Sequence, residues 1–277
     1  MAPPLFARGA GTGERRGRGA GAGLEFAEHR AYQEGDDLRH LDLHAYLRLQ
    51  QPLVRTFHAD RDQTLLLIVD LSGSMDLGRP RKADRAAEMA LGLVAAAVQG
   101  RDSVELRIAS PTAPHPVCGR DRSILGPARA ALVESAVGGD LALADILRHV
   151  HRRADRAVLI TDALVPDTAL VDTLRGLRAL SDRSTLLQVL APEDLDPGAE
   201  GLLPDGVHEL LDVESGERLR AHAGAALRSA WAQEARAWLD RVDRACRALG
   251  VQRVPVGTRT ALAPVFWGAL RRAGVLL

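Results

Sequence analysis

The chain has 277 residues, of which 46% are hydrophobic, and its 36 basic residues balance 36 acidic ones. This length suits one large domain with extensions, and the zero net charge excludes a global field that would attract nucleic acid or an anionic membrane. No apolar run approaches the roughly 18 residues of a membrane span. Cys118 and Cys246 are far apart in the sequence, as is usual for reduced thiols, so we expect a soluble cytoplasmic protein.

The first 23 residues are rich in Gly, Ala and Arg. They contain no hydrophobic stretch of the kind found in signal peptides, and a flexible arm is expected there. After residue 60, apolar runs predict strands over 64–70, 103–109, 157–161, 185–190 and 207–211. Apolar residues at helical spacing predict helices over 82–99, 141–153, 168–180 with Asp167 as its N-cap, 216–249 and 261–277.

Such alternation of strands and helices favours an α/β fold. We expect a doubly wound, mostly parallel sheet flanked by helices, with an N-terminal extension and C-terminal helices. The predicted parts are the arm (1–23), a head segment packed on the domain (24–60), the α/β domain (61–215) and a C-terminal helical extension (216–277). Ligands of such a sheet bind beyond the carboxyl ends of the strands, where the strand order reverses.

One predicted strand end carries oxygen ligands. The apolar run Leu65–Val69 leads directly into Asp70-Leu-Ser72-Gly-Ser74, in which alternate side chains can converge on one point. Mg²⁺ prefers near-octahedral oxygen ligation at about 2.0–2.1 Å and keeps some of its water, so a carboxylate and two hydroxyls suit it. The segment predicts a divalent-cation site, and a turn that caps the next helix is the structural alternative.

Two further acids stand at comparable positions. Asp162 follows the strand expected at 157–161, and Asp140 follows Gly138-Gly139 before a helix, where it is either an N-cap or a ligand. Crowded carboxylates raise one another's pKa unless a cation neutralises them. We therefore predict a site for Mg²⁺, with Mn²⁺ and Ca²⁺ as alternatives, formed by Asp70, Ser72, Ser74, Asp140 and Asp162.

These segments resemble the metal-ion-dependent adhesion site of von Willebrand factor A domains. The resemblance covers about residues 60–215 and rests on Asp70-x-Ser72-x-Ser74, the Gly138-Gly139 turn and Thr161-Asp162. It implies a Mg²⁺ held by the two serines, a threonine and two aspartates, with an open position for a carboxylate of a partner protein. The family usually has threonine where this chain has Asp140, and an additional carboxylate there would hold the cation more strongly and an acidic partner group less tightly.

The segment before the first predicted strand resembles the head of bacterial proteins catalogued as domain of unknown function 58. The motifs are Gly21-x-Gly23-x-Glu25-Phe26, Arg30-x-Tyr32, Gly35-Asp36, Arg39-x-x-Asp42 and, after the metal loop, Lys82-Ala-Asp84-Arg85-Ala86. Leu43 stands where that family usually has tryptophan. The charged side chains of the head could dock a partner, but we favour a buried network that braces the segment, made by Arg30, Asp36, Arg39 and Asp42.

Members of that family are typically encoded beside MoxR-type AAA+ ATPases. The resemblance therefore implies an adaptor or co-chaperone, whose partners are such an ATPase and a target protein with an acidic group. The alternative is an enzyme, a Mg²⁺-dependent phosphotransferase or hydrolase with Asp70 as nucleophile. Haloacid-dehalogenase-like enzymes of that kind need a second aspartate two residues later, where this chain has Ser72. We therefore expect a non-catalytic protein-binding module.

Overall fold

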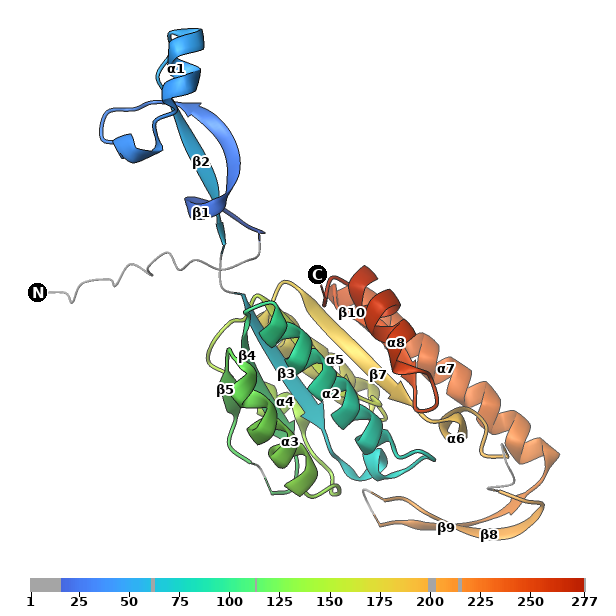
Figure 1. The fold of residues 1–277 in the computed structure, drawn as a ribbon. Helices are drawn as coiled ribbons and strands as arrows, with labels where there is room; N and C mark the ends of the chain where they lie inside the picture. The colour runs from blue at the N-terminus through green and yellow to red at the C-terminus, as the bar shows by residue number, and fades with distance from the viewer. Residues whose placement is uncertain (1–15, 61–62, 113, 199–202, 214–215, 277) are drawn as a thin grey trace, which may run out of the picture. The chain divides into compact units, whose positions relative to one another are not determined.

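The computed structural model describes residues 16–60, 63–112, 114–198, 203–213 and 216–276. The chain divides into two units, Met1–Gln63 and Thr64–Leu277, and the central sheet belongs to the second (Figure 1). Among the described residues, no helix is both long and apolar enough to cross a membrane.

The first unit is an antiparallel pair of strands with two short helices between them. Strand β1 (Arg16–Ala31) pairs with β2 (Leu53–Asp60), and η1 (Leu38–His40) and α1 (Leu43–Leu49) lie between them in the chain. The predicted arm lies outside the described residues as far as residue 15, whereas residues 16–23 belong to β1. A ladder of backbone hydrogen bonds needs no side chains, so a segment rich in Gly and Ala can form one.

The second unit is built on a six-stranded sheet with the order β10-β7-β6-β3-β4-β5. Its strands are β3 (Thr64–Asp70), β4 (Ser103–Ala109), β5 (Val117–Gly119), β6 (Arg156–Thr161), β7 (Ser184–Leu190) and β10 (Gln252–Gly257). All neighbours are parallel except β4 and β5. The sheet therefore has the doubly wound order, in which the winding reverses between β3 and β6. The predicted fold class is confirmed.

Helices cover both faces of this sheet (Figure 1). One face packs against α2 (Lys82–Gln99) and α3 (Leu125–Glu134), and the other against α4 (Leu143–Arg148), α5 (Asp167–Leu180) and α7 (Ala225–Leu249). Along β3, Leu65, Leu67 and Val69 belong to the first core, while Leu66 and Ile68 belong to the second. Because both faces are covered, β3 is an uninterrupted apolar run rather than an alternating one.

The C-terminal third differs from the prediction. The strand expected at 207–211 is β8 (Gly206–Leu211), which pairs with β9 (Arg218–Ala223) in a separate two-stranded sheet. Strand β9 takes the start of the helix predicted from residue 216, and α7 begins only at Ala225. The sixth strand of the main sheet, β10, contains Pro255 and lies at an edge, where a missing backbone N–H is tolerated. Residues 216–277 are therefore not only a helical extension, because they contribute the edge strand β10 to the main sheet.

Short helical segments complete the second unit. They are η2 (Gly73–Asp76), η3 (Arg122–Ile124), α6 (Pro192–Leu195), α8 (Leu262–Pro264) and the π-helical η5 (Val265–Leu270). Helix α4 is shorter than the helix predicted over 141–153. Segments α8 and η5 stand in place of the helix predicted over 261–277, and residue 277 lies outside the described residues. Asp167 is the first residue of α5, and Pro166 takes the N-cap position predicted for it.

Candidate metal centre at the carboxyl ends of β3 and β6

Two polar side chains meet at the point where the winding of the sheet reverses. Asp70 is the last residue of β3 and Thr161 is the last residue of β6. Because Val69 and Ile160 are register partners, the residues that follow them stand side by side. The Thr161 hydroxyl donates a hydrogen bond to Asp70 Oδ2 at 2.6 Å. The pair lies where doubly wound sheets bind their ligands.

The loop after β3 adds two hydroxyls. The backbone N–H of Ser72 donates to Asp70 Oδ1 at 2.9 Å, which folds the loop back over the carboxylate. The hydroxyl oxygens of Ser72 and Ser74 lie 3.4 Å apart, and both residues are buried. Ser72 precedes η2, but its side chain makes no capping hydrogen bond there, so the capping alternative does not account for it. One carboxylate and three hydroxyls form a donor set that suits a hard cation.

Asp70 is a buried acid without a basic partner. Its side chain is almost fully buried, and no basic side chain of the described residues forms an ion pair with it in the structure. Burial, together with the negative charge of Asp162, raises the pKa of Asp70 to about 6, although hydrogen bonds from Thr161 and Ser72 oppose the rise. An uncompensated buried carboxylate is costly and marks a functional-site candidate.

Asp162 is held differently from Asp70. Its Oδ1 accepts the Leu164 N–H at 3.0 Å, and its Oδ2 accepts the Lys82 ammonium at 2.7 Å. Lys82 Nζ also donates to Asp194 Oδ1 at 3.0 Å. Asp162 therefore lies close enough to Asp70 to perturb it, yet its carboxylate is already paired with an internal cation.

Lys82 entered the sequence reasoning only within the family motif that follows the metal loop, and Asp194 was missed by it. Lys82 is completely buried at the first position of α2, and burial alone would lower its pKa, but the charges of Asp162 and Asp194 outweigh burial and raise it. A positive charge opposes the helix dipole at this end, which is the only local signal that a carboxylate is required nearby. The partners lie 80 and 112 residues away along the chain.

The Gly138-Gly139 turn reaches the metal loop through its backbone. Gly138 N–H donates to the Leu71 carbonyl at 2.9 Å, and Gly73 N–H donates to the Gly139 carbonyl at 2.9 Å. Both glycines have positive φ, which favours glycine at these positions. Asp140, the next residue, is exposed. Within the described part of the chain, no three His, Cys, Asp or Glu side chains form a group that could hold a metal, and a role of Asp140 as a ligand stays a prediction.

The turn after β6 is strained. Ala163 has φ of 61°, a left-handed conformation that costs a residue with a Cβ roughly 1–2 kcal/mol. Its N–H donates to the Thr161 hydroxyl at 3.0 Å, and its carbonyl accepts the indole N–H of Trp238 in α7 at 3.2 Å. These bonds hold the residues on either side of Asp162, and strain of this kind gathers at functional sites.

The charged residues of the head make three separate groups. Arg30 pairs with Asp36 at 2.8 Å, whereas Asp42 caps α1 by accepting the Ala45 N–H at 3.0 Å. Arg39 pairs with neither acid: its partner is Asp37, at 2.7 Å. All of these side chains are exposed or half-buried, so they do not form the single buried network expected. The contacts brace turns within the first unit.

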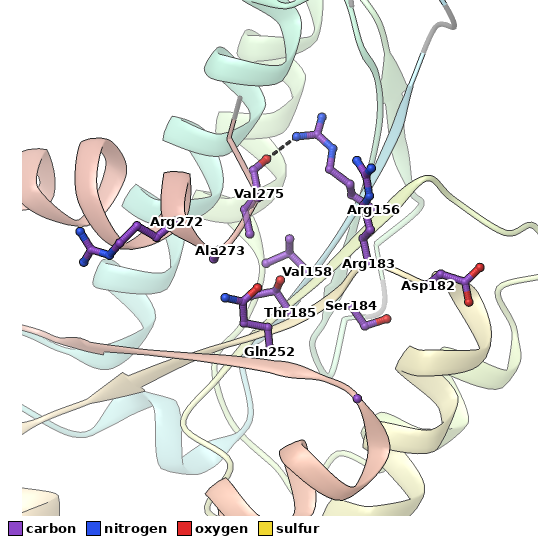
Figure 2. A pocket seen from close by; sticks show the side chains of 12 residues that line it. Arg156, Val158, Asp182, Arg183, Ser184, Thr185, Gln252, Arg272, Ala273 and Val275 are labelled. Carbon is purple, nitrogen blue, oxygen red and sulfur yellow. Dashed lines mark hydrogen bonds between the residues drawn. The ribbon is translucent and has the colours of Figure 1, made fainter. Parts of the chain in front are cut away.

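A pocket of about 420 Å³ lies at the opposite end of the strands from the candidate metal centre, at the amino ends of β6, β7 and β10 (Figure 2). The guanidinium of Arg156 donates to the Val275 carbonyl there and pairs with the buried Asp102. Asp182, also in the lining, is held by Arg153 and Arg178. In this pocket the buried side chain of Arg156 ties the C-terminal segment to the sheet through Val275.

Fold and site together define an α/β domain with a buried carboxylate and hydroxyl cluster at the reversal point of its sheet. The chain belongs to the family described as Protein of unknown function DUF58, whose model matches residues 28–240. Uncharacterized proteins of Mycobacterium tuberculosis and Mycobacterium bovis are each 35% identical over an alignment of 276 residues that covers 95% of this chain and 84% of theirs.

Likenesses to solved structures are weaker. BatB from Bacteroides thetaiotaomicron has a TM-score of 0.44 and 13% identity, over 76% of this chain and 98% of that one. The SpRpn10 VWA domain has a TM-score of 0.39 and 11% identity, over 73% of this chain and 92% of that one. The strand order of this chain by itself defines its doubly wound fold.

Proposed function

We propose that the second unit is a non-catalytic protein-binding module that holds an acidic group of a partner through a bound Mg²⁺. The observation that carries the proposal is Asp70: a buried carboxylate, surrounded by hydroxyls instead of basic side chains, at the reversal point of the sheet. A divalent cation would remove the cost of that charge.

The residues that would hold the cation are Asp70, Ser72, Ser74 and Thr161. Their oxygens are the ligand type that Mg²⁺ prefers, and Mg²⁺ keeps part of its coordination for water or for an outside ligand. Asp162 adds negative charge beside the ion, and Asp140 stays a predicted ligand on the neighbouring loop. When bound, the metal supplies a positive charge that a carboxylate of a partner protein can reach.

The partner class comes from the family resemblance. We propose that the protein acts in the cytoplasm as an adaptor or co-chaperone for a MoxR-type AAA+ ATPase, which supplies mechanical work while this domain holds the target. The chain has no Gly-x-x-x-x-Gly-Lys-Ser/Thr loop for nucleotide binding. ATP would then be hydrolysed by the partner alone.

Titration calorimetry with Mg²⁺ is the first test. The wild-type protein should bind one ion, Asp70→Asn should lose that binding, and Asp172→Asn should keep it, since Asp172 is an exposed aspartate of α5 that pairs with Arg175. Ser72→Ala and Ser74→Ala should each weaken it. Absence of binding in the wild-type protein would overturn the metal-dependent part of the proposal.

A second experiment tests the partner. The tagged protein is used as bait in lysate of its own organism, with Mg²⁺ or with EDTA, and retained proteins are identified by mass spectrometry. A MoxR-type ATPase retained with Mg²⁺, and lost both with EDTA and with Asp70→Asn, is the expected result. Identical retention under all conditions would contradict a role of the metal in partner binding.

A further inference from the structure

The ion group around Lys82 adjoins the candidate metal centre through Asp162, which follows Thr161 and whose charge perturbs Asp70. The ammonium joins three separate segments, because Lys82 begins α2, Asp162 follows β6 and Asp194 belongs to α6. The side chain of Lys82 is completely buried, and those of Asp162 and Asp194 are 2% and 8% exposed. Water therefore screens these charges poorly, and the charge of Asp162 raises the pKa of Asp70.

The formal charges of the group are unequal. Asp70, Asp162 and Asp194 carry three negative charges, and Lys82 supplies one positive charge. Both oxygens of Asp162 are engaged within the protein, by Lys82 and by the Leu164 N–H. Asp70, in contrast, accepts from the Thr161 hydroxyl and from the Ser72 N–H. Of the two neighbouring acids, Asp70 is the one whose charge no side chain of the described residues neutralises.

We propose that Lys82 is a built-in cation that limits the charge of the metal centre, so that a divalent ion bound at Asp70 keeps net positive charge toward an acidic partner. This inference rests on the proposed function. By holding Asp162, the ammonium leaves a single uncompensated carboxylate for the ion. It also repels the ion directly, which lowers metal affinity in exchange for stronger attraction of an outside carboxylate.

Charge and geometry make different predictions. If Lys82 acts through its charge, then removing a positive charge and removing a negative charge must have opposite effects on metal affinity. If it acts only by holding Asp162 in place, both changes loosen the group and both weaken metal binding. Lys82→Met and Asp194→Asn are close to the original side chains in shape and separate the two cases.

Calorimetric titration of the full chain with Mn²⁺ and with Mg²⁺ at pH 7.5 measures the effect. Lys82→Met should bind the metal about tenfold more tightly or better, and Asp194→Asn should bind it about tenfold more weakly, the scale expected for one poorly screened charge beside a divalent ion. The Lys82→Met/Asp194→Asn double variant restores the formal charge and should bring the affinity back toward the wild-type value.

Arg81→Met is the matched control, since it removes a positive charge one residue away that is half exposed and pairs with Asp76 and Asp84. It should change metal affinity by about twofold or less, because water screens exposed charges. Circular dichroism confirms that each variant is folded. Should Lys82→Met fail to fold, Asp194→Asn keeps the Lys82–Asp162 pair and still decides the sign.

The outcomes separate this inference from the proposed function. Wild-type binding with weaker binding in both single variants overturns the charge role and leaves the proposed function intact. Metal binding by Lys82→Met alone shows that Lys82 repels the ion, but it overturns both the Mg²⁺ dependence of the native protein and the inference that a natively bound ion faces an acidic partner. No binding by any of these proteins overturns both.

Discussion

Replacing Asp70 with asparagine removes a buried negative charge while keeping the shape of the side chain. The amide oxygen can still accept the Ser72 N–H, and the amide N–H₂ can donate to the Thr161 hydroxyl, which now donates to Asp70. Few contacts are lost. The main change is that the variant can no longer ionise at this position.

The magnitude follows from the pKa of Asp70, which burial and the charge of Asp162 raise from 3.8 to about 6. A difference of about two units corresponds to about 3 kcal/mol at 1.36 kcal/mol per unit. The pKa is higher in the folded than in the unfolded state, so the folded state binds more protons between pH 4 and 6. Without metal, the stability contributed by this group therefore falls as pH rises through that window and is constant above it.

Urea unfolding in EDTA at pH 4, 6 and 7.5 tests this. Asp70→Asn should be more stable than the wild-type protein by up to about 3 kcal/mol at pH 7.5, and the advantage should disappear near pH 4. Asp172→Asn, on the exposed face of α5, should stay within about 0.5 kcal/mol of wild type throughout.

Saturating Mg²⁺ should reverse the order at pH 7.5. A ligand that binds only the folded state at 1,000 times its Kd adds about 4.1 kcal/mol of stability, which exceeds the advantage of about 3 kcal/mol expected for Asp70→Asn, and only the protein with Asp70 should gain it. An Asp70→Asn variant that is less stable than wild type in EDTA at pH 7.5, or a difference that does not change with pH, would refute the reasoning.

Three further substitutions test the packing, each by urea unfolding. Arg156→Met leaves the buried Asp102 without this partner and should lower the free energy of unfolding by about 3–5 kcal/mol. An Asp102→Leu/Arg156→Met double variant should restore most of that stability, and equal losses in both variants would contradict this. Ala163→Gly should raise stability by about 1 kcal/mol because glycine accepts φ of 61° without strain, and a loss would show that the turn is unstrained. Gly92→Ala would place a Cβ 2.3 Å from the Phe266 ring and should cost about 1–3 kcal/mol, whereas an unchanged stability would mean that the ring moves away freely.

Much of the second unit could be predicted from local pattern. Strands β3 and β4 and helix α2 have the bounds expected from the sequence, 64–70, 103–109 and 82–99. A strand buried on both faces must be apolar throughout, and a helix that packs closely on a sheet needs small apolar residues on one face. The position of Asp70 at a strand end follows from the same pattern, and so does its place among hydroxyls two and four residues later.

The edges of the fold were decided by contacts between distant segments. Val207–Leu211 forms a strand as predicted, but its partner is β9 rather than a strand of the main sheet. The sixth strand, β10, contains a proline that argues against a strand when judged locally. The proline is tolerated because β10 lies at the edge of the sheet. Whether a strand lies at an edge depends on its partners in space, and the local sequence pattern carries no information about them.

The charge balance of the candidate metal centre also required the tertiary structure. Asp70 and Asp162 stand at predicted strand ends, so the sequence by itself determined that two acids meet beyond the sheet. It did not determine that Lys82 and Asp194 join them, because these residues come from a helix start and a short helix with no shared pattern. Electrostatic pairing depends on distance in space and on burial, and neither is a property of separation along the chain.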